Sequence, residues 1–190
     1  MNISILTLNL FWMSFNIILA SIPVYISYYL YKKKKFKNSA QKYSLILLWV
    51  LFVPNTIYII TDIIHFPLQL LYVDGIYILI LLFEYIVFIP LAFITYYLSF
   101  SFFEAFLVKS KRYNKYLFLI IFILNMLISL GLWLGRIQRT HSWYVFTNPL
   151  GVIKDILLLL SNTHYVLAIL VFGIALNLFY FFLKNKIKVI

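Results

Sequence analysis

Five long apolar runs constrain this chain more than any other feature of its sequence. Each is about 20 residues or longer, the length that an α-helix needs to cross the hydrocarbon core of a membrane. Their bounds are Leu8–Tyr31, Tyr43–His65, Gly75–Phe102, Tyr116–Leu134 and His164–Leu183. Of the 190 residues, 65% are hydrophobic and 11% charged, whereas soluble domains average about 45–50% and about 25%. The sequence predicts an all-α integral membrane protein with about five transmembrane helices in one membrane domain, residues 1–190.

Most of the charge lies in three basic clusters that flank these runs. The net charge is +11, from 16 basic and 5 acidic residues. The clusters are Lys32, Lys33, Lys34, Lys35, Lys37 and Lys42, then Lys109, Lys111, Arg112 and Lys115, and finally Lys184, Lys186 and Lys188. Because cytoplasmic loops carry such an excess of basic residues, we expect the N-terminus outside and the C-terminus inside. Lysines placed in this way predict contact with the lipid bilayer and no binding of nucleic acid.

Two segments remain for the outer side of the membrane, Phe66–Asp74 and Gly135–Thr163. The second contains Leu150–Ser161, an apolar piece with Lys154 and Asp155 in its middle. This piece is too short to cross the membrane, so we expect a short interfacial or re-entrant helix near residues 150–161. All 3 histidines and most of the 5 acidic residues fall in or next to these segments. Polar chemistry is therefore concentrated on the predicted outer side.

A polar stripe runs down the second span. If the helix continues past Pro54, then Asn55, Tyr58, Asp62 and His65 fall within an arc of about 80°. Pro54 removes a backbone donor and is expected to kink the helix. Because a stripe of this kind is costly against lipid, it should face other helices or a water-filled cavity.

The fourth span has a matching stripe. It consists of Asn125, Ser129, Arg136, Arg139 and Trp143, which share one helical face if the helix continues past Leu134. Gly131 and Gly135 form a GxxxG motif on a neighbouring face, which permits close contact between helices.

Glu84 is a third polar feature, about 15 Å into the third span by helical rise. Asn125 lies at a similar depth by the same count. A carboxylate this deep is costly, so it predicts either a buried hydrogen bond between helices or a group that couples transport to protons.

Two motifs in these stripes resemble those of a family of bacterial membrane proteins, the domain of unknown function 1361. The first comprises Pro54, Asn55, Tyr58, Thr61 and Asp62. The second comprises Leu134, Gly135, Arg136, Arg139, Ser142 and Trp143. His65 and the Asn148–Pro149 pair also fit. The resemblance implies a multi-pass protein of the bacterial cytoplasmic membrane, and it implies no reaction.

The polar residues support several readings of a site. Asp62 with Arg136 and Arg139 predicts an ion pair between the second and fourth spans, an anion site for a phosphate or carboxylate, or both. Asp62 with His65 is a candidate acid–base pair. The spacing matches no metal-ligand motif, and the absence of cysteine excludes thiol ligands. We expect no cofactor, and no nucleotide-binding or common hydrolase motif occurs.

The leading functional hypothesis is a helical bundle with a polar pocket open to the outer face. Its expected lining is Asn55, Tyr58, Asp62, His65, Arg136, Arg139 and Trp143, and its expected ligand is an anionic lipid or a small phosphate-bearing molecule. One alternative is a proton-coupled transporter subunit that uses Glu84 and forms a homo-oligomer. Another is a structural membrane protein without a ligand. The sequence does not decide whether the protein is an enzyme.

Overall fold

The computed structural model describes residues 2–33, 36, 38–109 and 111–186. Within these ranges the chain is all-helical, as predicted. Five helical segments are long and apolar enough to cross a membrane: Ile3–Lys32, Ser39–Leu70, Ile76–Val108, Leu117–Gln138 and Thr163–Lys186. The five predicted spans are thus confirmed, while the orientation of the termini stays a prediction. Four lysines of the predicted clusters lie outside the described residues: Lys34, Lys35, Lys37 and Lys188.

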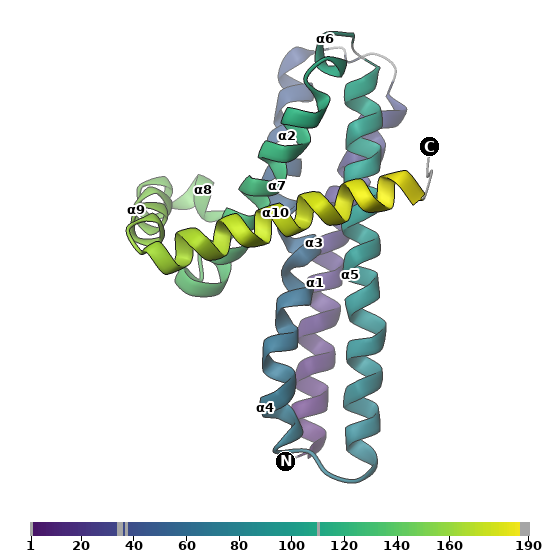
Figure 1. Cartoon of the computed structure of the whole chain (residues 1–190), viewed down its shortest axis with the longest axis vertical. Helices are drawn as coiled ribbons and strands as arrows, with labels where there is room; N and C mark the ends of the chain where they lie inside the picture. Colours follow the sequence, from purple (N-terminus) through teal and green to yellow (C-terminus); the bar gives the residue numbers. More distant parts are fainter. Residues whose placement is uncertain (1, 34–35, 37, 110, 187–190) are drawn as a thin grey trace.

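Three of the spans run side by side as a rod (Figure 1). Helices α1 (Asn2–Lys32) and α5 (Ile76–Val108) extend along its whole length. The second span is divided into four consecutive pieces: α2 (Ser39–Phe52), α3 (Asn55–Tyr58), the 3-10 helix η1 (Ile59–His65) and α4 (Phe66–Leu70).

The division of the second span starts at Pro54, which has no backbone N–H to donate. Polar side chains bind carbonyls near the break. Asn55 and Thr56 each donate to a carbonyl three residues earlier, at 2.9 and 2.8 Å. Thr61 of η1 does the same, donating to the carbonyl of Tyr58 at 2.6 Å. Side-chain donors of this kind let a broken helix persist inside a membrane, which explains why so many of them follow Pro54.

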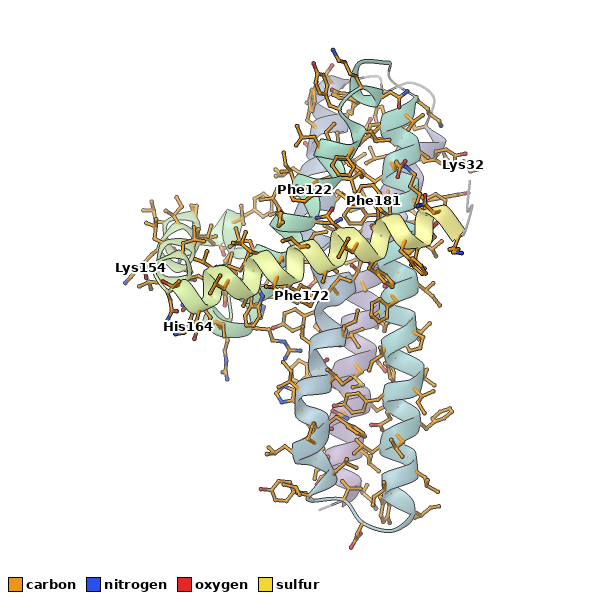
Figure 2. All side chains as sticks on the ribbon, viewed as in Figure 1. Lys32, Phe122, Lys154, His164, Phe172 and Phe181 are labelled. Atoms are coloured by element: carbon orange, nitrogen blue, oxygen red, sulfur yellow. The ribbon has the colours of Figure 1, made fainter. Side chains whose placement is uncertain are left out.

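The second half of the chain packs beside this rod. Its elements are α6 (Lys111–Asn114), α7 (Leu117–Trp133), the π-helix η2 (Leu134–Gln138), α8 (Tyr144–Thr147), α9 (Pro149–Leu160) and α10 (Thr163–Lys186). The predicted short helix near residues 150–161 is present as α9. Helix α10 crosses the rod obliquely, and α8 and α9 lie to one side (Figure 1). Lys154 and His164 lie on that side, apart from the rod (Figure 2).

The basic ends of several helices gather at one end of the rod. Lys109, after α5, donates to the carbonyl of Tyr31 near the end of α1 and lies 4.1 Å from the centroid of its ring. Lys42, at the start of α2, lies 5.4 Å from the ring of Phe106. Cation–π contacts of this type are favourable where the ammonium is partly desolvated. The first two basic clusters, far apart in sequence, are therefore neighbours in space.

Helices α5, α7 and α10 meet at a buried polar junction. The Tyr96 hydroxyl donates to Asn125 Oδ1 at 2.8 Å, and Asn125 Nδ2 donates to Asn177 Oδ1 at 3.0 Å. Ser129 donates to the carbonyl of Ile169 at 2.7 Å. Asn125 and Ser129 therefore face α10. The prediction that they share one face with Arg136 and Trp143 is wrong. The π-helix η2 changes the helical register between Asn125 and Arg136, and the helix ends at Gln138, before Trp143.

We expect N125L to lower the free energy of unfolding by roughly 1–2 kcal/mol, because it leaves Asn177 Oδ1 without its interhelical donor. Denaturant unfolding in detergent measures this change. T95V is the matched control, since within the described chain the Thr95 hydroxyl bonds only to the Ala92 carbonyl of its own helix, and it should change stability much less. Equal effects of the two substitutions would contradict a stabilising role for the junction.

Candidate functional site

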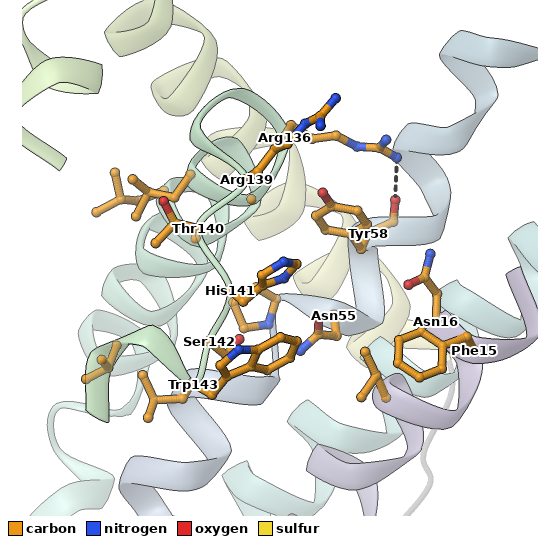
Figure 3. Close-up of a pocket in the computed structure, with 18 of the residues that line it drawn as sticks. Phe15, Asn16, Asn55, Tyr58, Arg136, Arg139, Thr140, His141, Ser142 and Trp143 are labelled. Carbon is orange, nitrogen blue, oxygen red and sulfur yellow. Dashed lines mark hydrogen bonds between the residues drawn. The ribbon is translucent and has the colours of Figure 1, made fainter. Parts of the chain in front are cut away.

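A cavity of about 600 Å³ opens between the rod and the second half of the chain (Figure 3). One wall comes from α1 and the base from α2, α3 and η1. The opposite wall comes from α7, η2 and the loop that follows them, with residues of α8 and α9 at its edge. The volume falls within the range of about 300–1,000 Å³ that is usual for small-molecule sites. The cavity is therefore large enough for a ligand.

Arg136 ties the two sides of the cavity together. Its guanidinium forms an ion pair with Asp62, and the side chains are 19% and 15% exposed. Arg136 Nε donates to Thr61 Oγ1 at 2.6 Å, and Nη2 donates to the carbonyl of Tyr58 at 3.2 Å (Figure 3). The guanidinium also lies 4.5 Å from the centroid of the Tyr58 ring, within the range of a cation–π contact. The predicted ion pair between the second and fourth spans is thus formed, with nearly every donor of Arg136 engaged.

Two glycines allow this close approach. A Cβ atom on Gly135 would lie 2.8 Å from the ring of Tyr58, and one on Gly131 would lie 2.9 Å from Pro54 Cγ. Neither helix could approach so closely with larger residues at these positions. The GxxxG motif therefore serves the contact of α7 and η2 with α3.

His65 does not contact Asp62 in the way that the candidate acid–base pair requires. Its Nε2 lies 3.4 Å from Arg136 Nη1. Among the described residues, no hydrogen bond joins it to Asp62, whose carboxylate binds the guanidinium instead. A guanidinium is always charged and offers a carboxylate several donors in a fixed fork. The geometry on which an Asp62–His65 acid–base pair depends is therefore not formed.

Arg139 contrasts with Arg136. It ends the π-helix in the left-handed conformation, with φ of 54°, and it lines the cavity. Within the part of the chain that the structure describes, its guanidinium has no hydrogen-bond or ion-pair partner. A left-handed conformation costs a residue with a side chain about 1–2 kcal/mol. Arg139 is thus an exposed cation that lines the cavity in a strained backbone conformation.

Several uncharged polar groups also face the cavity without a partner. The Asn16 amide, the Tyr58 hydroxyl and the Ser142 hydroxyl make no side-chain hydrogen bond within the described residues. Beside them His141 stacks on Trp143, with ring centroids 4.4 Å apart and planes 9° apart. Polar groups inside a membrane protein normally bind one another, water or a ligand. These three groups therefore remain available for hydrogen bonds that the described residues do not supply.

Most of the predicted site residues converge on this cavity. The lining includes Asn55, Tyr58, Asp62, His65, Arg136, Arg139 and Trp143. The two predicted buried polar residues lie elsewhere, Glu84 being 6% exposed on α5 and Asn125 fully buried at the junction with α10. The continuous α-helix assumed for the second span is absent, yet its polar stripe still reaches the cavity, because the short turns α3 and η1 keep those residues on one side.

Sequence reasoning missed the contribution of α1. Asn9, Trp12, Phe15, Asn16 and Leu19 line the cavity, although none of the predicted site residues comes from the first span. The available signal was the pair Asn9 and Asn16, whose spacing of seven residues puts two amides on one face of an apolar helix.

Comparison with known protein families shows which family this chain belongs to. Residues 15–179 match the family described as "Protein of unknown function (DUF1361)". The chain belongs to the DUF1361 family. No curated protein and no solved structure matches it.

The resemblance to DUF1361 is thereby confirmed, and both of the motifs that indicated it lie within the matched residues. In this DUF1361 protein the first motif contributes Pro54, Asn55, Tyr58 and Asp62 to the cavity, and every residue of the second motif lines it. Two segments separated by a whole transmembrane helix in the sequence thus build one site.

Proposed function

We propose that this multi-pass membrane protein of the DUF1361 family binds an anionic amphiphile in the cavity. Arg139 carries the proposal, because it lines the cavity as an exposed residue and its guanidinium has no hydrogen-bond or ion-pair partner among the described residues. A guanidinium is well suited to hold a phosphate or carboxylate through two parallel hydrogen bonds.

The charge balance of the cavity also favours an anion. Two arginines and one aspartate line it, and the aspartate is neutralised by Arg136. One positive charge therefore remains uncompensated, beside the free hydroxyls of Tyr58 and Ser142. An anionic headgroup would supply the missing charge and accept hydrogen bonds from these donors.

The apolar wall indicates an amphiphile rather than a free anion. Trp12, Phe15 and Leu19 line the cavity on the α1 side, and Leu127 and Leu130 line it on the α7 side. Trp12 and Phe15 are 56% and 41% exposed, so this wall continues onto the surface that lipid chains contact in a membrane. A ligand with an acyl or isoprenoid chain would bury that chain here.

The proposal is for binding, with no reaction assigned. A general base must be free to accept a proton, whereas Asp62 is held by Arg136 and His65 contacts the same guanidinium. We place the protein in the bacterial cytoplasmic membrane, with the lysine-rich end of the rod inside according to the positive-inside rule. The cavity then lies toward the outer leaflet.

Thermal unfolding in detergent tests the proposal with three probes. Dioctanoyl phosphatidic acid should raise the unfolding temperature of the delipidated protein, since a ligand at 100 times its Kd stabilises by about 2.7 kcal/mol. Dioctanoyl phosphatidylcholine, with the same chains and no net charge, should raise it much less. Inorganic phosphate alone should have little effect, because it cannot use the apolar wall.

R139Q should abolish the stabilisation by phosphatidic acid. K154Q is the matched control, because Lys154 is an exposed cation on α9 that does not line the cavity. An equal loss in both variants would indicate nonspecific attraction between charges and contradict the site. An undiminished response in R139Q would contradict the proposed role of Arg139.

A further inference from the structure

A second polar network lies inside the rod, next to the cavity. Asn9 on α1 and Gln69 on α4 bind each other reciprocally through their amides, at 3.1 and 3.0 Å. Asn9 Nδ2 also donates to Glu84 Oε2 on α5, at 3.3 Å. The amide pair thus connects two helices, α1 and α4, to a glutamate on a third, α5, that is 6% exposed.

Glu84 has no cation beside it. Among the described residues its carboxyl has Asn9 as hydrogen-bond partner and no ion pair. The other glutamate of the chain, Glu104, is also buried on α5, but it pairs with Lys184 and accepts from the Tyr180 hydroxyl. A buried carboxylate that lacks a cation is strongly disfavoured relative to its neutral form. Glu104 is therefore compensated by a cation, whereas Glu84 is not.

The hydroxyl of Tyr85 lies at a branch point of this network. Its oxygen is 3.0 Å from Gln69 Oε1 and 3.2 Å from the backbone carbonyl oxygen of Asp62. A phenol has only one hydrogen to donate, so it cannot fully satisfy both acceptors at once. The geometry fits two alternative hydrogen-bond arrangements with the same heavy-atom positions.

We propose that Glu84 is a proton-binding site whose protonation reverses this network. When the carboxyl is ionised, Asn9 Nδ2 donates to it and Tyr85 donates to Gln69 Oε1. When a proton from the solvent binds to the carboxyl, Glu84 donates to Asn9 Oδ1. The Asn9 and Gln69 amides then turn by 180°, which their symmetric shape allows. Gln69 now donates to Tyr85, and Tyr85 donates to the Asp62 carbonyl.

Both arrangements satisfy Glu84 and the Asn9 and Gln69 amides, and they differ in whether Tyr85 donates to Gln69 or to the Asp62 carbonyl. The network also touches the cavity at two places. Asn9 itself lines the cavity. Asp62, whose carbonyl accepts from Tyr85 in the protonated arrangement, holds Arg136 through its side chain. The proton on Glu84 is therefore linked to the cavity by two routes, through the Asn9 amide and through the backbone of η1. This inference does not depend on the identity of the ligand.

Few other charged or titratable groups surround Glu84. Tyr85 on α5 interacts electrostatically with Glu84, with Asp62 on η1 and with Arg136 on η2, and Tyr77 packs in the same apolar cluster as Tyr85. Asp62 and Arg136 neutralise each other, and His65 is exposed to solvent. The side chains that reach toward Glu84 from α1 and α4 are the uncharged amides Asn9 and Gln69. Of these neighbours, none offers Glu84 a free cation.

Nuclear magnetic resonance of the whole protein in detergent tests this site. Because the chain has only two glutamates, Glu84 and Glu104, labelling glutamate with ¹³C at the carboxyl gives two signals. The E84Q and E104Q variants assign them. We expect the Glu84 carbon to move between the neutral and ionised positions as the pH is changed, and the side-chain amide signals of Asn9 and Gln69 to follow with the same midpoint.

The two variants also serve as matched test and control. E84Q has the shape of the protonated residue and cannot titrate, so its Asn9 and Gln69 amide signals should lose this pH dependence, whereas E104Q should keep it. A Glu84 carbon that does not titrate while the protein remains folded would overturn the inference. Amide signals that stay fixed while Glu84 titrates would overturn it equally.

Discussion

Replacing Arg136 by alanine is expected to lower the free energy of unfolding by about 3 kcal/mol, the lower end of the range for buried ion pairs that lose one partner, because this pair is partly buried. The substitution leaves the Asp62 carboxylate, 15% exposed, without its cation. It also removes the bonds to Thr61 and to the Tyr58 carbonyl. Unfolding of the purified protein in detergent, followed by tryptophan fluorescence or by loss of helical signal, measures the change.

Arg139 provides the control for this prediction, three residues away on the same segment. Because its guanidinium has no partner within the described chain, R139A should change stability by less than about 0.5 kcal/mol. A double-mutant cycle sharpens the test: D62A/R136A should be less destabilised than the sum of the two single variants, since no unpaired charge remains. Similar effects of R136A and R139A would contradict the structural role of the ion pair.

The second large effect is expected at Gly131. G131A should destabilise the fold by about 1–3 kcal/mol, because the added Cβ would lie 2.9 Å from Cγ of the rigid Pro54 ring. Helix α7 would have to move away from α3, which would also widen the cavity. Thermal unfolding in detergent measures the loss of stability.

L119F is a suitable control for added bulk on the same helix. Leu119 is 53% exposed on α7, on a surface that faces lipid in a membrane, so a larger side chain there should be tolerated. If G131A were as stable as the wild type, the close packing of α7 against Pro54 would be contradicted.

The spans could be predicted from the sequence because each is a nearly uninterrupted apolar run of sufficient length. The short helix α9 could be predicted for the complementary reason, since Leu150–Ser161 is apolar but too short to cross. The convergence of Asp62 and Arg136 could also be predicted, because two charged groups near one membrane face have few partners other than each other.

The helix faces were harder to predict. Lipid-facing and protein-facing positions are about equally apolar in a membrane helix, so periodicity carries little information. The π-helix η2 is the clearest case: its altered register turns Arg136 toward the second span while Asn125 faces α10. The spacing of the polar residues in the sequence does not indicate this change of register. The Asn9–Gln69–Glu84 network was missed because its members come from three separate helices.

The central claim is that the cavity holds an anionic amphiphile against Arg139, and native mass spectrometry of the purified protein tests it most directly. The comparison uses the wild type, K154Q and R139G. Glycine relieves the left-handed strain at position 139, so R139G should stay within about 1 kcal/mol of wild-type stability. We predict a bound anionic lipid or phosphate ester on the wild type and on K154Q, and none on R139G. The same bound species on all three proteins, or none on the wild type, would contradict the claim.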